Sequence, residues 1–77
     1  MSAKLPRLSG EEVVKILVNR FDFELIKRKG SHMTLINTHQ RPPKLLAIPA
    51  RNELKTGTLM MNVEDSGVGR EAFLKAV

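Results

Sequence analysis

The sequence contains no cysteine, tryptophan or tyrosine, and phenylalanine occurs only three times in 77 residues. The lack of cysteine excludes disulfides and thiolate metal sites, and it suits a reducing cytoplasm, which is the expected location. The scarcity of aromatic side chains gives little support to base stacking, the usual way in which proteins hold single-stranded RNA. The composition therefore narrows the ways in which this chain could bind a nucleic acid.

Long apolar runs are also missing. No segment approaches the roughly 20 apolar residues that a membrane span needs, and residues 1–8 carry no run typical of a signal peptide. The hydrophobic content of 42% is enough for one modest core, since a chain this short buries only about 60% of its unfolded surface. We therefore expect one domain, residues 1–77, with no membrane partner.

Motifs for common cofactors are absent as well. The only histidines are His32 and His39, and neither has a carboxylate at ligand spacing, so no metal site is expected. Gly57 and the stretch 67–69 lack the strand, spacing and lysine of a phosphate-binding loop. No serine stands in a nucleophile elbow. The sequence thus predicts no metal and no small-molecule cofactor.

Positive charge is concentrated in the middle of the chain. The formal net charge is +5, and residues 27–55 hold seven of the thirteen cations but only one of the eight acids. That segment is therefore +6, while the remaining residues sum to −1. Such clustering is typical of a surface that faces a polyanion. A basic solvated face without any ligand remains the alternative.

A helix is predicted over residues 9–19. Ser9 and Glu12 have the spacing of a capping box, and the apolar residues that follow recur at helical intervals. Val14 and Val18 widen the apolar stripe. So broad an apolar face should lie on a sheet.

Three strands are expected after this helix, over residues 23–28, 31–37 and 44–48. Lys29-Gly30 forms the turn between the first two, since glycine adopts positive φ readily. In the second strand, Met33 and Leu35 should face one side while His32 and Thr34 face the other.

Two further helices complete the prediction. The first opens at Thr56, which serves as its cap, and ends at Ser66-Gly67; the last covers residues 70–77. Three consecutive strands with short links form an antiparallel meander, and helices from both ends of the chain can cover one of its faces. The expected fold is α+β, a two-layer sandwich of order α-β-β-β-α-α. Its other face is open and carries His32.

The most informative segment is residues 27–32, which place three cations, a turn and an imidazole together. RNA carries its own nucleophile, the 2′-hydroxyl, so its cleavage needs no metal. It needs cations that stabilise the phosphorane and a group that titrates near neutrality, such as histidine with an unperturbed pKa of about 6.5. His32 is the candidate for proton transfer. Lys27, Lys29 and Arg51 are candidates for the cationic role.

These residues resemble a known family. The landmarks Lys29-Gly30-Ser31-His32, Ile48-Pro49 and 53–59 (Glu-Leu-Lys-Thr-Gly-Thr-Leu) follow the order and spacing of the HicA (YcfA-like) toxins. The resemblance covers nearly the whole chain and implies a double-stranded-RNA-binding-domain-like fold. It also implies an mRNA interferase, the ribonuclease toxin of a type II toxin–antitoxin system, with His32 as catalyst and a HicB-type antitoxin as partner.

The residues expected to contact mRNA are Lys27, Lys29, Gly30, Ser31, Arg51 and Lys55. One position departs from the family pattern. Many members carry another histidine shortly after the Ile/Val-Pro pair, and Arg51 stands there in this chain. The cation is kept, but a titratable group is lost.

Two other functions are compatible with these residues. A lone histidine in a strand is more often structural than catalytic, so the chain could be a non-catalytic RNA-binding module on the same fold. It could also be a protein-interaction module whose open face binds an acidic segment. His39 lies in a polar loop and is assigned no role.

Overall fold

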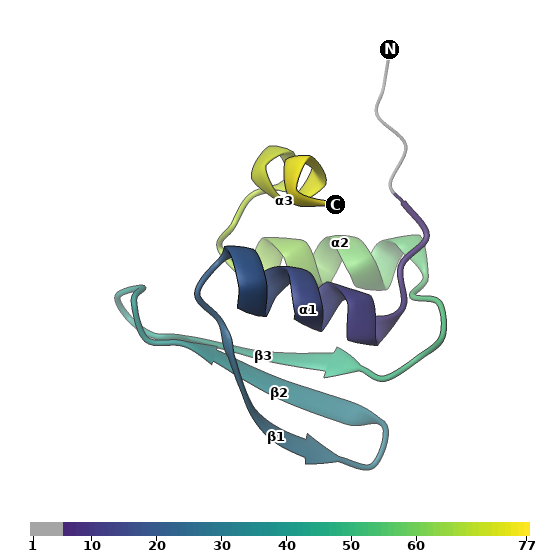
Figure 1. The fold of residues 1–77 in the computed structure, drawn as a ribbon, viewed down its shortest axis with the longest axis horizontal. Coiled ribbons are helices and arrows are strands. Elements are labelled where there is room, and N and C mark those ends of the chain that lie inside the picture. The colour runs from purple at the N-terminus through teal and green to yellow at the C-terminus, as the bar shows by residue number, and fades with distance from the viewer. Residues whose placement is uncertain (1–5) are drawn as a thin grey trace.

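The computed structural model describes residues 6–77, in which three helices accompany a three-stranded sheet (Figure 1). The elements follow in the predicted order: α1 (Gly10–Arg20), β1 (Glu24–Lys29), β2 (His32–Asn37), β3 (Lys44–Pro49), α2 (Thr56–Asp65) and α3 (Arg70–Ala76). α1 and α2 lie on one side of the sheet, and α3 packs against both helices further from the strands. Within residues 6–77, the other side of the sheet is uncovered, as expected.

The sheet is an antiparallel meander in the order β1-β2-β3. A two-residue turn, Gly30-Ser31, joins the first two strands, and Gly30 has a φ of 57°, which is left-handed and suits a residue without a Cβ. The turn predicted at Lys29-Gly30 is thus wrong by one residue, because Lys29 stays in the ladder as the partner of His32.

The first strand, predicted over residues 23–28, is interrupted by a β-bulge. Leu25 pairs with Leu35, and Lys27 pairs with Thr34, so Ile26 is an extra residue without a partner in the ladder. A one-residue insertion exchanges the faces of every side chain that follows it. The bulge therefore decides which side chains after Ile26 reach the open face.

The core lies between the sheet and the helices, and its predicted faces are confirmed. Met33 and Leu35 of β2 are completely buried, whereas His32 is exposed on the opposite face. The three helices and β3 contribute further buried side chains, whereas β1 contributes none; among them are Val13, Leu17, Leu46, Ile48, Leu59, Val63 and Phe73. Val18 is the exception to the predicted stripe, because it lines an open groove between α1 and β1.

The capping box predicted for α1 is present. The Glu12 amide donates to the Ser9 hydroxyl at 3.0 Å, and the Ser9 amide donates to the Glu12 carboxylate at 2.9 Å. The cap predicted for α2 is wrong, since Thr56 is already helical and Lys55 is the N-cap, without a side-chain hydrogen bond. The predicted end of α2 is confirmed at Ser66, whose hydroxyl donates to the carbonyl of Val63 at 2.6 Å.

Candidate functional site

Lys29, His32 and Pro49 form one row across the sheet. His32 pairs directly with Lys29 of β1 and with Pro49 of β3, and directly opposed residues of antiparallel strands project from the same face. His32 is exposed, and its Nδ1 atom lies 3.5 Å from the Ser31 hydroxyl, at the outer limit of a hydrogen bond. The imidazole is thus open to a ligand beside a lysine.

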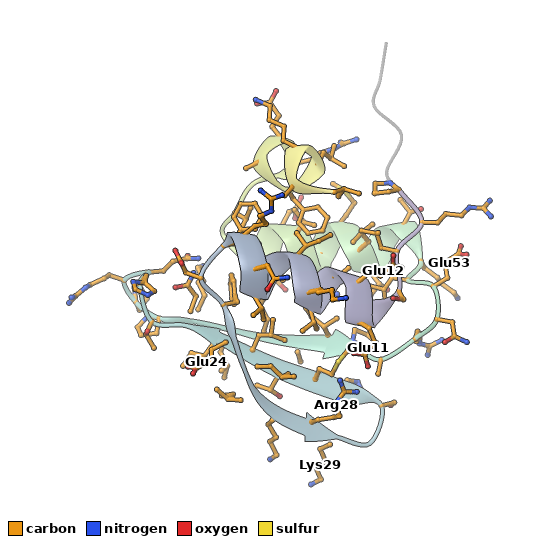
Figure 2. The ribbon with its side chains drawn as sticks, viewed as in Figure 1. Glu11, Glu12, Glu24, Arg28, Lys29 and Glu53 are labelled. Carbon is orange, nitrogen blue, oxygen red and sulfur yellow. The ribbon has the colours of Figure 1, made fainter. Side chains whose placement is uncertain are left out.

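Both lysines of β1 share this face. Lys27 pairs with Thr34, which is the next residue of β2 on the same side as His32. Figure 2 shows the Lys29 side chain pointing away from the helices. The fold therefore brings two of the predicted RNA-contacting residues next to the predicted catalyst.

Arg28 lies on the opposite face and binds α1. It pairs with the buried Met33, and its guanidinium donates two hydrogen bonds to the Glu11 carboxylate at 2.7 and 2.9 Å (Figure 2). These hydrogen bonds, assisted by charge attraction, hold the pKa of Glu11 below its ordinary value and raise the pKa of Arg28. Of the three cations in the run, Arg28 therefore ties the hairpin to α1 and does not face the open side.

Two more cations border a pocket beside this row. The pocket measures about 220 Å³ and is lined by Pro49, Arg51, Leu54, Lys55 and Thr58. Since Pro49 is also the partner of His32 in the sheet, the pocket adjoins the row that carries the imidazole. The fold thus brings Arg51 and Lys55, which are distant from the hairpin in sequence, to the same end of the sheet as Lys29.

Backbone contacts fix the segment that carries Arg51. The Ala50 amide donates to the carbonyl of Ser31 at 2.6 Å, and the Gly10 amide donates to the carbonyl of Arg51 at 2.9 Å. A Cβ atom on Gly10 would overlap the carbonyl oxygen of Pro49. The start of α1, the hairpin turn and the end of β3 are therefore held against one another.

On the open face beyond the imidazole, β2 and β3 carry apolar side chains beside Glu24 and Lys27 of β1, which the sequence reasoning missed. Ile36 pairs with Leu45, and Thr34 pairs with Ala47, so these four side chains adjoin one another. Leu45 is 64% exposed. The signal in the sequence was the run 45–48 (Leu-Leu-Ala-Ile), because a strand that is apolar on both faces is typical of one covered on both.

His39 lies away from this site. Its amide donates to the Asn37 side chain at 2.8 Å, and Asn37 ends the strand that His32 begins. Five residues of strand separate these ends by roughly 17 Å. The loop that contains His39 is fastened to the end of α2, where the Gln40 side chain donates to the carbonyl of Ser66 at 2.8 Å.

Among residues 6–77, no three side chains of His, Cys, Asp or Glu gather where they could hold a metal ion. No helix in this part of the chain has both the length and the apolar character needed to cross a membrane.

These features define a small α+β protein whose open sheet face carries an exposed imidazole between basic side chains at one end. A family model described as the HicA toxin of bacterial toxin–antitoxin systems matches residues 10–68. The chain therefore belongs to the HicA toxin family, which implies an antitoxin as its partner. The match runs from the first residue of α1 past α2, so it includes the whole sheet. No curated protein and no solved structure matches the chain.

Proposed function

We propose that this HicA-family protein is an mRNA interferase, a metal-independent endoribonuclease that cleaves mRNA and thereby inhibits translation. The observation that carries the proposal is the position of His32, an exposed imidazole in direct register with Lys29 on the open face. Membership of a toxin family supports it. The substrate is single-stranded mRNA, the compartment is the cytoplasm, and the partner is a HicB-type antitoxin.

The proposed reaction uses the substrate's own 2′-hydroxyl. The 2′-oxygen attacks the adjacent phosphorus, the bond to the 5′-oxygen breaks, and a 2′,3′-cyclic phosphate and a 5′-hydroxyl result. His32 either removes the proton from the 2′-hydroxyl, while water protonates the departing 5′-oxygen, or protonates the 5′-oxygen, while water accepts the proton of the 2′-hydroxyl. Imidazole suits both roles. Lys27 and Lys29 on the same face stabilise the negative charge that develops on the phosphorane.

The other residues predicted to contact RNA lie next to His32 and these two lysines. Gly30 and Ser31 form the turn directly after Lys29, where their backbone can approach a phosphate closely. Arg51 and Lys55 border the pocket beside Pro49, where they hold the next phosphate of the chain. The proposed RNA path thus crosses the sheet at the end that carries the imidazole.

The test is cleavage of a single-stranded mRNA by purified protein in EDTA. We expect His32→Ala to lower the cleavage rate about 100-fold or more, since general acid–base groups contribute roughly 10²–10⁴. His39→Ala is the matched control and should cleave as the wild type does, because His39 lies at the other end of β2. The proposal is wrong if the folded His32→Ala variant cleaves normally, or if the wild type does not cleave.

A non-catalytic RNA-binding module on the same fold is the second candidate. One observation favours it: His32 is the only imidazole at its end of the sheet in residues 6–77, because Arg51 stands where a second histidine is common in the family and His39 lies far away. This candidate predicts RNA binding that weakens steeply with salt. It also predicts that His32→Ala changes neither RNA affinity nor cell growth, which separates it from the ribonuclease.

A further inference from the structure

β1 is the strand of the sheet that the core holds least. Within residues 6–77 it is an edge strand that pairs only with β2, and all six of its side chains are exposed. The bulge at Ile26 interrupts its ladder as well. The strand nevertheless carries Lys27 and Lys29, the cations proposed to stabilise the phosphorane. Because β1 buries no side chain, packing in the core does not fix where these two lysines stand.

An ion pair links this strand to the helices. The Arg28 guanidinium donates to both oxygens of the Glu11 carboxylate, at 2.7 and 2.9 Å, and Figure 2 shows Arg28 directed toward α1 while Lys29 points away. The two side chains are 50% and 57% exposed, and exposed ion pairs contribute only modestly to stability. A bidentate arginine–carboxylate pair, however, fixes both distance and orientation. Its main effect is therefore on the position of β1.

The glutamate end of this pair is itself firmly held. Glu11 follows Gly10, whose amide donates to the carbonyl of Arg51 at 2.9 Å. Gly10 also lies so close to Pro49 that a Cβ atom would not fit between them. The capping box holds the same turn of α1. The carboxylate of Glu11 thus offers Arg28 a fixed point that is joined to the end of β3.

These contacts form a closed ring around the imidazole. Lys29, His32 and Pro49 lie in one row of the sheet, Pro49 contacts the start of α1, and Glu11 of α1 binds the residue that precedes Lys29. Breaking the ion pair opens this ring at β1, whereas His32 keeps its partner in β3. A misplacement of about 1 Å can lower a catalytic rate about 100-fold, so the rate should depend on the pair.

We propose that Glu11 and Arg28 are a positioning pair for RNA cleavage: by holding β1, they keep Lys27 and Lys29 where negative charge develops on the phosphorane. Neither Glu11 nor Arg28 touches RNA, because the pair lies on the side of the sheet that carries the helices. The inference rests on the proposed function and adds two residues behind the sheet to its site. Charge attraction tolerates small displacements, so loss of the pair lowers kcat and leaves KM unchanged.

The test compares Glu11→Gln with Glu71→Gln in the RNA cleavage assay. Both variants lose one acid from the first turn of a helix, but Glu71 lies on α3, away from the sheet. We expect Glu11→Gln to lower kcat about tenfold at an unchanged KM, and Glu71→Gln to cleave as the wild type does. Circular dichroism and urea unfolding check that each variant is folded under the assay conditions.

Variants of Arg28 separate positioning from direct contact with RNA. Arg28→Gln should lower kcat as much as Glu11→Gln does, and the double variant should be no slower than either, because both changes break the same pair. Arg28→Lys keeps a charged donor without the bidentate fork and should retain an intermediate rate. In a Lys29→Gln background, Glu11→Gln should have a smaller effect, since one of the residues that the pair positions is gone.

A folded Glu11→Gln variant with the wild-type kcat overturns the inference. Additive losses in the double variant also overturn it, since they would assign Arg28 to RNA, and so does an effect of Glu11→Gln that Lys29→Gln leaves undiminished. Failure of the ribonuclease proposal is distinct. If the wild type does not cleave, both proposals are wrong; if cleavage depends on His32 but not on Glu11, only the positioning role is wrong.

Discussion

Glu11 and Arg28 are joined by two hydrogen bonds of 2.9 and 2.7 Å that tie the first turn of α1 to β1. The arginine belongs to a run of three cations, yet it is the one that does not face the open side of the sheet. This pair fixes the strand from which Lys27 and Lys29 project. The hairpin and the helix are thus linked on one face, while the proposed RNA surface lies on the other.

The stability that this pair contributes should depend on pH. The hydrogen bonds from Arg28 keep the pKa of Glu11 in the folded protein below its ordinary value, so the contribution is present above about pH 4.3, the unfolded value, and is lost as the pH falls further. Glu11→Gln should therefore lower the free energy of unfolding at pH 7 and have a smaller effect at pH 3. Urea unfolding at both pH values measures this, and the effect should disappear at both in an Arg28→Gln background.

The two lysines and the arginine of β1 should differ in their effect on RNA binding. The slope of log K against log salt concentration is negative, and removing one phosphate contact with a single strand makes it shallower by about 0.7. Lys27→Gln and Lys29→Gln should each make the slope shallower by about this amount. Arg28→Gln should leave the slope unchanged, because its side chain faces α1. Titrations of labelled single-stranded RNA at several salt concentrations decide this. Equal slopes for the three variants would contradict the assignment of faces.

Gly10 should not tolerate a side chain. A Cβ atom there would overlap the carbonyl oxygen of Pro49, so Gly10→Ala should lower the free energy of unfolding by about 1–3 kcal/mol. Gly57→Ala is the matched control, since a Cβ atom at Gly57 meets nothing within 4 Å and the residue lies in α2. It should be neutral or stabilising by up to about 1 kcal/mol. Thermal and urea unfolding of both variants measure the difference.

Replacing either of the two buried asparagines by leucine should change the free energy of unfolding, but in opposite directions. The Nδ2 atom of Asn62 is buried without a hydrogen-bond partner among the described residues, so Asn62→Leu should stabilise the fold by about 1 kcal/mol. Asn37 donates to the carbonyl of Phe21 at 2.9 Å and accepts from the amide of His39 at 2.8 Å. Asn37→Leu should therefore destabilise it by about 1–3 kcal/mol, because both partners lose their hydrogen bond. A destabilising Asn62→Leu would show that its amide is satisfied in solution.

The helices, the strands and the side of the sheet on which His32 lies follow from the sequence alone. These features depend on neighbours in the chain: a capping box joins residues three apart, and the alternation of Met33 and Leu35 with His32 follows from the geometry of one strand. The order of the strands and the turn near Gly30 follow from the same local signals. The family resemblance carried by these residues is confirmed by the family match.

Which cations share the face of His32 depends on contacts between segments that are distant in the sequence. The bulge at Ile26 depends on the register between β1 and β2, and no pattern within β1 reveals it, because Leu25 and Lys27 would share a face in a regular strand. Packing between distant segments likewise brought Arg51 and Lys55 to the pocket beside Pro49. Hydrogen bonds within one segment can be predicted from the local sequence. The pairing of two segments depends on how they pack in the folded protein, so the local sequence does not predict it.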